Sequence, residues 1–348
     1  MYRVKKTLGV LLAPVFLILL WAPVAGGAEP GSPEVRKAVA GAVKYLDREL
    51  SAPGYDGTLE WAMLGFYGVG ADLQHLSDAR EAQIARGIMI SEAKSTDYQR
   101  SVIGALAAGK NPDGYGGKNL LQGVISSQMP GGKFADSIDG TGVRLINAHI
   151  WGIISIYASG RDIPNADKAL RWLEWHQNPD GGFGIDTRVA HSDVDMTAMA
   201  LIAIACLGKD GSYPAAARAL DYLKEQQYED GTFGVWGVST AESCAQVIQA
   251  LVILGIDPAS DQWSKGGSNP VTGLLQFRLA DGSFTHGAGG PANNMATAQA
   301  LIALGDYHAG ASVYQRIRQS GEPSIGEGAS QTQPKLYNSL INLILSHQ

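Results

Sequence analysis

A loop motif that recurs about every 50 residues constrains the fold of this chain more than any other feature. Three copies share the pattern Q-x-x-x-G-x-F, and a fourth is closely related. The motif phenylalanines are Phe134, Phe183, Phe233 and Phe284, which are 49, 50 and 51 residues apart. Periods of roughly 20 to 50 residues are typical of proteins built from stacked, equivalent units. We therefore expect a repeat protein.

Each repeat contains two predicted helices, one on either side of the loop. Before the loop, segments such as ADKALRWLEWH and AAARALDYLKEQ have apolar residues at helical spacing and a charged opposite face. After the loop, segments such as MTAMALIAIACL and CAQVIQALVIL carry no charge. A helix that is apolar all round is typically buried on every side. Outer amphipathic helices should therefore alternate with inner apolar ones.

The number of repeats predicts a closed ring. Two weaker units precede the clear ones, with outer helices expected near residues 34–49 and 78–91, and Pro and Gly separate successive pairs. This gives six helical hairpins, and a C-terminal helix at 335–347 could form a seventh or close the ring. The predicted fold is all-α, an α/α toroid (barrel) with inner and outer helix rings, forming a single domain from 29 to 348.

The N-terminal segment is expected to be a secretory signal rather than part of the fold. Residues 1–28 have a cationic start, an apolar stretch and a small-residue site that would allow cleavage after Ala28. No later stretch is long and apolar enough to span a membrane. We therefore expect a secreted protein or one on the exterior of the cell envelope. An exported protein could pair Cys206 with Cys244, but both lie in apolar helical patterns that favour two buried thiols.

Composition limits the partners. The net charge is −6, and no cluster of Lys and Arg would neutralise phosphates, so a nucleic-acid-binding protein is excluded. No metal site is predicted. Glu242 and Cys244 have the spacing of two zinc ligands in protein prenyltransferases, but the next inner helix offers no His as a third.

The glycine loops resemble the QW-type repeats of the prenyltransferase and squalene oxidocyclase superfamily, whose members include the terpenoid cyclases. The resemblance extends from about residue 34 onward. Within the superfamily, DVDMTAMAL, ESCAQVIQAL and NNMATAQALIAL are most similar to exported bacterial repeat proteins related to the transcobalamin and intrinsic-factor toroid. This resemblance implies an α/α toroid that binds a bulky ligand, with a corrinoid as one candidate and no other cofactor.

The segment DVDMTA at 193–198 also resembles the D-x-D-D-T-A signature of class II terpene cyclases. That resemblance implies Asp195 as the general acid, with Asp193 and His191 beside it. Such an acid needs a carboxyl kept protonated by burial and by its neighbours. Here Met196 replaces the third Asp of the signature, which removes one of those neighbours.

Helix capping is the competing interpretation of the same carboxylates. Asp is a preferred N-cap, and a carboxylate in a first helical turn is stabilised by about 0.3–1 kcal/mol. Glu242 and Asp97 occupy the corresponding position before their own apolar helices. Recurrence at three helix starts favours capping.

A ligand site is predicted where the inner helices begin. If all of them start on one side of the ring, polar side chains from several helices and loops surround one opening. An apolar well rimmed by polar groups is the usual form of a small-molecule site. The candidate ligand-binding residues are Asp97, Glu242, Asn294, Trp236 and His286.

Three functions therefore stay open. The first is a non-catalytic binding module for a bulky, partly apolar ligand, either corrinoid or isoprenoid-like, or for another exported protein. The second is a class II terpene-cyclase-like isomerase that uses Asp195. The third is a polysaccharide-active toroid, for which His149, Arg144 and Arg188 would supply the base and the positive charge.

Overall fold

The computed structural model describes residues 29–51, 57–88, 91, 93–235 and 237–321. The expected signal segment at 1–28, the C-terminal helix at 335–347 and Trp236 lie outside these ranges. The helices are α1 (Pro33–Glu49), α2 (Leu59–Val69), α3 (Gln74–Ala85), α4 (Ser95–Ala107), α5 (Leu120–Ser126), α6 (Ile146–Ala158), α7 (Ala166–Trp175), α8 (Val194–Cys206), α9 (Pro214–Gln226), α10 (Ala241–Ile253), α11 (Pro270–Leu275), α12 (Asn294–Ala309) and α13 (Val313–Gly321). Short elements lie in the connections: η1 (Tyr115–Gly117), η2 (Asp261–Trp263), and the antiparallel pairs β1 (Gly234–Val235) with β2 (Val238–Ser239) and β3 (Phe284–Thr285) with β4 (Ala292–Asn293).

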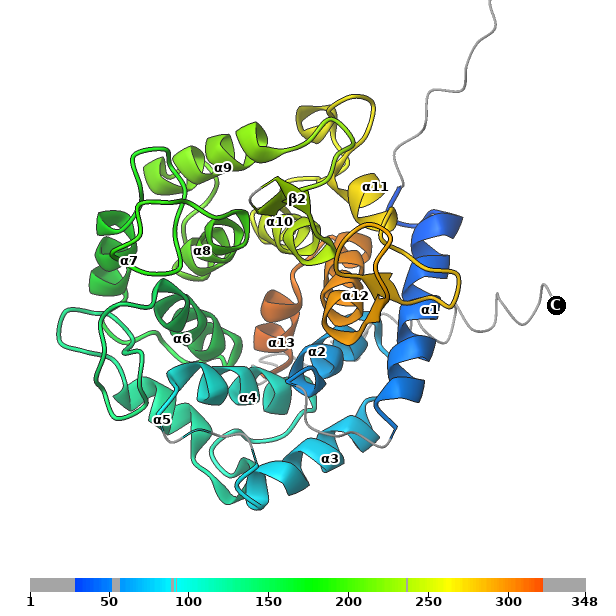
Figure 1. Ribbon diagram of the computed structural model, residues 1–348. Coiled ribbons are helices and arrows are strands. Elements are labelled where there is room, and N and C mark those ends of the chain that lie inside the picture. The colour runs from blue at the N-terminus through cyan, green and yellow to red at the C-terminus, as the bar shows by residue number, and fades with distance from the viewer. Residues whose placement is uncertain (1–28, 52–56, 89–90, 92, 236, 322–348) are drawn as a thin grey trace, which may run out of the picture.

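The helices form two concentric rings, as predicted (Figure 1). The odd-numbered helices α1 to α11 lie outside, and the even-numbered helices α2 to α12 lie inside. The ring closes because α12 packs against both α10 and α2. Close approach at this closure depends on small residues: a Cβ at Gly65 would meet Leu301 at 3.0 Å. The α/α toroid with six hairpins is confirmed.

The repeated phenylalanines anchor each loop to its inner helix. All four are fully buried. The backbone N–H of Phe183 donates to Thr197 Oγ1 at 2.9 Å, and that of Phe284 donates to Thr297 Oγ1 at 2.9 Å. A buried N–H needs such an acceptor. The threonine in DVDMTA therefore has a structural role.

Two residues considered for chemistry occupy the same structural position in other repeats. The N–H of Phe134 donates to His149 Nδ1 at 3.0 Å, and that of Phe233 donates to Cys244 Sγ at 3.2 Å. His149 Nε2 bonds the Ala169 carbonyl at 3.0 Å, and burial lowers the pKa of this imidazole to about 3. With both ring nitrogens engaged, His149 cannot serve as the base of a polysaccharide-active site, so that assignment is wrong.

The glutamine of the motif connects neighbouring repeats. Gln177 Nε2 donates to the Gly181 carbonyl of its own loop at 2.7 Å and to the Ala215 carbonyl of the next outer helix at 2.8 Å. Gln227 donates likewise to the Trp263 carbonyl at 2.8 Å. Both cysteines are free and buried, as expected.

The structure corrects one helix boundary. The outer helix predicted at 78–91 spans Gln74–Ala85, because Gly87 adopts a left-handed conformation (φ 74°) that ends the helix.

Helix α13 covers one end of the ring, at the C-terminal ends of the inner helices (Figure 1). Arg316 donates to the Gly68 carbonyl of α2 at 2.6 Å and pairs with Asp306 of α12 at 2.8 Å. Arg318 donates to the Tyr157 carbonyl of α6 at 2.9 Å, and Gln315 reaches α10. The sequence analysis did not anticipate this helix, and the helix expected at 335–347 lies outside the described residues.

The opposite end is the mouth, which we define as the N-terminal ends of the inner helices α4, α6, α8, α10 and α12 and the loops leading into them. Backbone hydrogen bonds join neighbouring loops there, such as Ile146 N to the Ile185 carbonyl at 3.0 Å and Ala241 N to the His286 carbonyl at 3.0 Å. The inner helices thus begin on one side, as the sequence analysis supposed.

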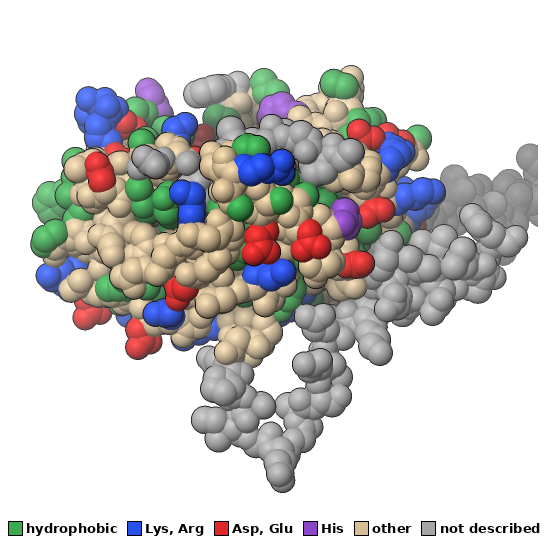
Figure 2. Space-filling view, turned by 90° about the horizontal axis from the view of Figure 1, so that it is seen from below, with side chains coloured by type: hydrophobic (Ala, Val, Ile, Leu, Met, Phe, Trp, Pro, Cys, Tyr) green, Lys and Arg blue, Asp and Glu red, His purple; other side chains and the backbone are tan. Residues whose placement is uncertain are grey.

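Seen from its edge, the ring carries interspersed acidic and basic side chains (Figure 2). Among the described helices, none has the length and apolar character needed to cross a bilayer.

Candidate functional site

The two carboxylates of DVDMTA have different environments at the mouth. Asp193 is the N-cap of α8, and its Oδ1 accepts from the Met196 N–H at 2.9 Å. Asp195 lies in the first helical turn and makes no cap hydrogen bond. The same division holds at α10, where Thr240 is the cap and Glu242 follows it. A side-chain cap hydrogen bond is therefore made by Asp193 but not by Asp195 or Glu242, which lie in first helical turns where the helix dipole stabilises a carboxylate.

Asp195 faces the interior of the ring. It shares one stripe of α8 with Met199, Ile202 and Cys206, because spacings of 4, 7 and 11 residues return to the same helical face. Cys206, at the far end of this stripe, interacts electrostatically with Arg318 of α13. At about 1.5 Å per residue, Asp195 lies about 16 Å from the covered end of the ring.

The carboxyl of Asp195 is held partly protonated near neutral pH. Burial raises its pKa to about 6, and the charges of Asp193 and Glu242 act in the same direction. A hydrogen bond with Ser243 and the charge of His286 oppose the rise. Its Oδ1 is buried and has no hydrogen-bond partner among the described residues. A group with this pKa can donate a proton at physiological pH.

Residues of α10 and its neighbouring loop complete the surroundings of Asp195. His286 Nδ1 lies 3.0 Å from Glu242 Oε2, and His286 is largely exposed. Thr240 donates its hydroxyl proton to Ser243 Oγ at 2.8 Å, which leaves the Ser243 proton for Asp195. Ser243 was not predicted, although its place beside Glu242 at the start of an inner helix was a usable signal.

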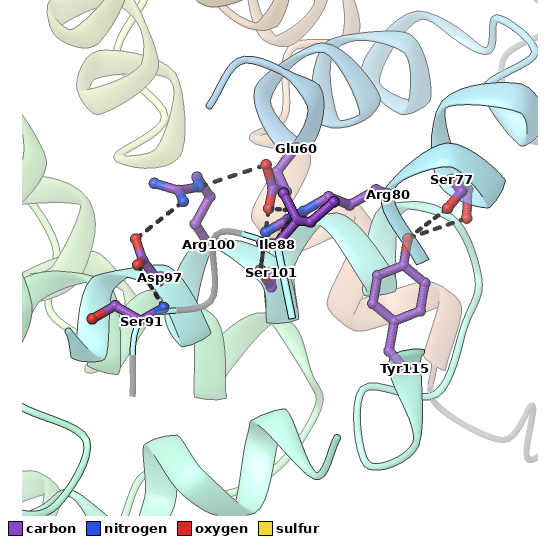
Figure 3. A network of polar contacts seen from close by, with 9 residues as sticks. All are labelled: Glu60, Ser77, Arg80, Ile88, Ser91, Asp97, Arg100, Ser101 and Tyr115. Carbon is purple, nitrogen blue, oxygen red and sulfur yellow. Dashed lines mark hydrogen bonds and ion pairs between the residues drawn. The ribbon is translucent and has the colours of Figure 1, made fainter. Parts of the chain in front are cut away.

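Asp97 is engaged in a buried ionic network (Figure 3). Its Oδ1 accepts from Arg100 Nη2 at 3.1 Å, and Arg100 Nε lies 3.5 Å from Glu60 Oε2. Glu60 also pairs with the wholly buried Arg80 at 2.6 Å, and Ser101 donates to the same carboxylate. These contacts give Asp97 a structural role, so its assignment as a ligand-binding residue is not supported by the geometry.

The other predicted residues lie away from Asp195. Asn294 Oδ1 accepts from the Tyr45 hydroxyl at 2.9 Å and so joins the inner ring to α1. His191 is exposed and lines a separate groove beside α9. His286, rather than His191, is the histidine whose charge acts on Asp195. Arg144 and Arg188 both pair with Asp186 in the mouth loops.

Aromatic side chains and amide side chains face each other across the ring interior. Trp61 of α2 and Trp151 of α6 meet with ring centroids 5.0 Å apart, although α4 separates their helices, and Tyr314 of α13 lies 6.3 Å from Trp151. On α10 and α12, Gln246 and Gln249 both donate to Gln299 Oε1, at 3.1 and 3.4 Å. Trp61 was missed by the sequence analysis.

Comparison with known proteins points to the terpene cyclases. Residues 185–286 match the squalene-hopene cyclase C-terminal domain. The chain is 30% identical over 132 residues to drimenyl diphosphate synthase of Streptomyces showdoensis, covering 38% of this chain and 24% of that protein. It is 36% identical over 107 residues to squalene–hopene cyclase of Alicyclobacillus acidocaldarius, covering 25% of this chain and 17% of that protein. The matched segments thus span no more than about a quarter of these relatives.

Solved structures share the fold over most of the chain. The type II terpene cyclase MstE from Scytonema, in complex with merosterolic acid A, has a TM-score of 0.57 at 11% identity, with 80% of this chain and 98% of that chain covered. An unsaturated glucuronyl hydrolase specific for heparin has a TM-score of 0.56 at 14% identity, with 79% and 96% covered.

These matches confirm the predicted toroid of the prenyltransferase and squalene-cyclase type. The region matching the squalene-hopene cyclase domain contains Asp193, Asp195, Glu242 and His286. The narrower relation to transcobalamin-like proteins stays a prediction.

Proposed function

We propose that this toroid binds an isoprenoid, or a similarly bulky apolar ligand, inside the ring and protonates it with Asp195, as a class II terpene-cyclase-like enzyme. One observation carries the proposal: a half-buried, interior-facing carboxyl with a buried, unpartnered oxygen and a pKa of about 6. Strongly perturbed carboxyls cluster at functional sites. The two relatives are named drimenyl diphosphate synthase and squalene–hopene cyclase.

The proposed chemistry is proton transfer to a carbon–carbon double bond. The O–H bond of Asp195 breaks, the π electrons form the new C–H bond, and positive charge develops on the ligand. Roughly one carboxyl in ten is protonated at pH 7 when the pKa is about 6, and half at pH 6. The faces of Trp61 and Trp151 can stabilise a cation in the interior.

Asp193 and Glu242 substitute in this proposal for the acidic residue that Met196 replaces. Their negative charges both raise the pKa of Asp195. The exposed His286, paired with the partly buried Glu242, acts on Asp195 electrostatically and can return a proton to the acid after each turnover.

Incubation in D₂O tests the proposal. Purified protein is incubated with squalene and, separately, with geranylgeranyl diphosphate, and products are analysed by gas chromatography and mass spectrometry after removal of any diphosphate. We expect the unmodified protein to form a cyclised product that carries one deuteron from the acid. The Asp195→Asn variant should form no product. Asp193→Asn is the matched control, because Asn retains the cap; it should shift the pH optimum downward but retain activity. Absence of product from both substrates would exclude an enzyme of this type for them.

Binding without chemistry is the second candidate, and the amide cluster favours it. Gln246 is 6% exposed, and its Oε1 has no partner among the described residues. Together with Gln249 and Gln299, it offers hydrogen bonds that a hydrocarbon cannot use, whereas the amide groups around a corrinoid can. Titration with hydroxocobalamin, followed by its absorbance, tests this candidate. Saturable binding that is unchanged in Asp195→Asn and weakened in Gln246→Leu would support a binding module.

Export, predicted from residues 1–28, is part of both proposals. The sequence analysis also left open that the binding module takes another exported protein instead of a small molecule. That possibility would be favoured if neither isoprenoids nor hydroxocobalamin were retained.

A further inference from the structure

A second site lies beside the mouth, outside the ring interior. A groove of about 610 Å³ runs between the end of α9 and the loops that lead into α8 and α10. Its polar lining residues are Asp180, His191, Ser192, Tyr222, Gln226 and Tyr228. Asp195 does not line it, so the groove is separate from the proposed acid. Its volume falls within the range of pockets that hold small organic ligands.

The groove gathers hydrogen-bonding side chains that the protein itself does not use. Within the described ranges, the side chains of His191, Tyr222, Gln226 and Tyr228 form no hydrogen bond with protein. Glu242 and His286, at the start of α10 and in the neighbouring loop, are by contrast paired with each other. Each of the four unused groups can both donate and accept.

Tyr222 is the most informative of these residues. It is only 7% exposed, yet its hydroxyl has no protein partner in the described part of the chain. The hydroxyl oxygen opens into the groove, where a ligand can bond to it. Burial and the nearby carboxylates of Asp180 and Asp193 raise the pKa of Tyr222 to about 12, so the hydroxyl keeps its proton and remains a donor.

The charge of the groove excludes anionic ligands. No Lys or Arg is among its described lining residues, and Asp180 contributes a negative charge. The Asp180 carboxylate is held in place because its Oδ1 accepts from the Gly182 N–H at 3.0 Å and from Ser192 Oγ at 2.6 Å. A phosphate or a uronate would meet repulsion with no compensating cation.

We propose that this groove binds a neutral sugar. Sugar hydroxyls both donate and accept, as the four unused side chains do, and the tyrosine rings offer flat apolar surface to the C–H face of a pyranose. Asp180 can accept from two adjacent hydroxyls. The ligand can be a free saccharide or the terminal residues of a glycan on a larger molecule, since both present the same hydroxyl pattern.

Saturation-transfer NMR on the purified protein tests the proposal. The probes are glucose, galactose, mannose and N-acetylglucosamine with their β-linked disaccharides, and glucuronic acid serves as the anionic comparison. We expect at least one neutral disaccharide to bind saturably and glucuronic acid not to bind. Tyr222→Phe should weaken binding about fivefold, the equivalent of one hydrogen bond. Tyr213→Phe is the matched control, because the Tyr213 hydroxyl bonds Glu174 at 2.6 Å, outside the groove.

Several results would overturn the proposal. They are the absence of saturable binding by any neutral probe, binding of glucuronic acid as tight as that of glucose, and equal effects of the two tyrosine substitutions. A free disaccharide that binds as tightly as a glycopeptide carrying the same glycan places recognition in the sugar, whereas binding of the glycopeptide alone would refute it. Asp195→Asn should leave sugar binding unchanged, so this test and the cyclase test fail independently.

Discussion

Replacing Asp195 by Asn should stabilise the protein at neutral pH. The carboxyl has an ordinary pKa of 3.8 when the chain is unfolded and about 6 in the folded protein. The folded state therefore binds the proton more tightly, and stability falls as the pH rises from 3.8 through 6. Below 3.8 the carboxyl is protonated in both states and contributes nothing. Asparagine resembles the protonated acid in shape and carries no charge, so it removes the penalty.

The size of the effect follows from the two pKa values. A difference of about 2 units corresponds to about 3 kcal/mol once both states are ionised. The gain from Asp195→Asn should therefore be about 1.6 kcal/mol at pH 5 and about 3 kcal/mol at pH 8. A stabilising substitution that abolishes activity is the expected behaviour of a carboxyl retained for function at the expense of stability.

Urea denaturation followed by circular dichroism at pH 5 and pH 8 measures the gain. Asp193→Ala is the control: loss of the α8 cap should cost about 1 kcal/mol at pH 5. The cost should be smaller at pH 8, because removal of the Asp193 charge also eases the ionisation of Asp195. The reasoning about Asp195 is refuted if Asp195→Asn destabilises the protein at pH 8, because a carboxylate that was satisfied in the fold would behave in that way. A gain that does not depend on pH would also contradict it.

Two further substitutions test the structural assignments. Thr197→Val keeps the side-chain shape but leaves the Phe183 N–H unpaired; it should lower the free energy of unfolding by about 1–3 kcal/mol in urea, and Thr197→Ser should restore most of the loss. Equal losses for Val and Ser would show that the hydroxyl is not the acceptor that matters. Arg80→Met leaves Glu60 buried with Arg100 as its one remaining cation in the described part of the chain, and should lower the free energy of unfolding by about 3–5 kcal/mol, measured by calorimetric melting. Adding Glu60→Gln in a double variant should recover part of this loss. Additive losses in the double variant would argue against direct coupling of Glu60 and Arg80.

The repeat period was sufficient to predict the toroid, because each loop motif marks the junction between an amphipathic helix and an apolar one. The motif also predicted which positions are structural, and the four buried phenylalanines confirm it. The same regularity concealed the roles of His149 and Cys244. Their side chains accept the loop N–H that a threonine accepts in the other repeats, and nothing in their residue types indicates this.

The environment of Asp195 could not be predicted from its own segment. Burial, Ser243, Asp193, Glu242 and His286 set its pKa, and all three of Ser243, Glu242 and His286 come from other repeats. Trp61 was missed for a different reason. Its helix is apolar on nearly every side, so hydrophobic periodicity cannot indicate which face lies toward the interior.

Helix α13 is polar in sequence and resembles another outer helix, yet its arginines bond backbone carbonyls and Asp306 at the end of the ring. Its position depends on groups contributed by α2, α6 and α12, which no local pattern reveals.

Because α13 covers the end opposite the mouth, the described ring is covered at one end only. Under the proposed function, a ligand held inside the ring would enter and leave through the mouth, past Asp195, and a bound product would block the next ligand until it left. Product release would then govern turnover, and a ligand much longer than the distance between Asp195 and Cys206 would have to fold back on itself. The helix that completes the packing would thereby also limit the length of the ligand.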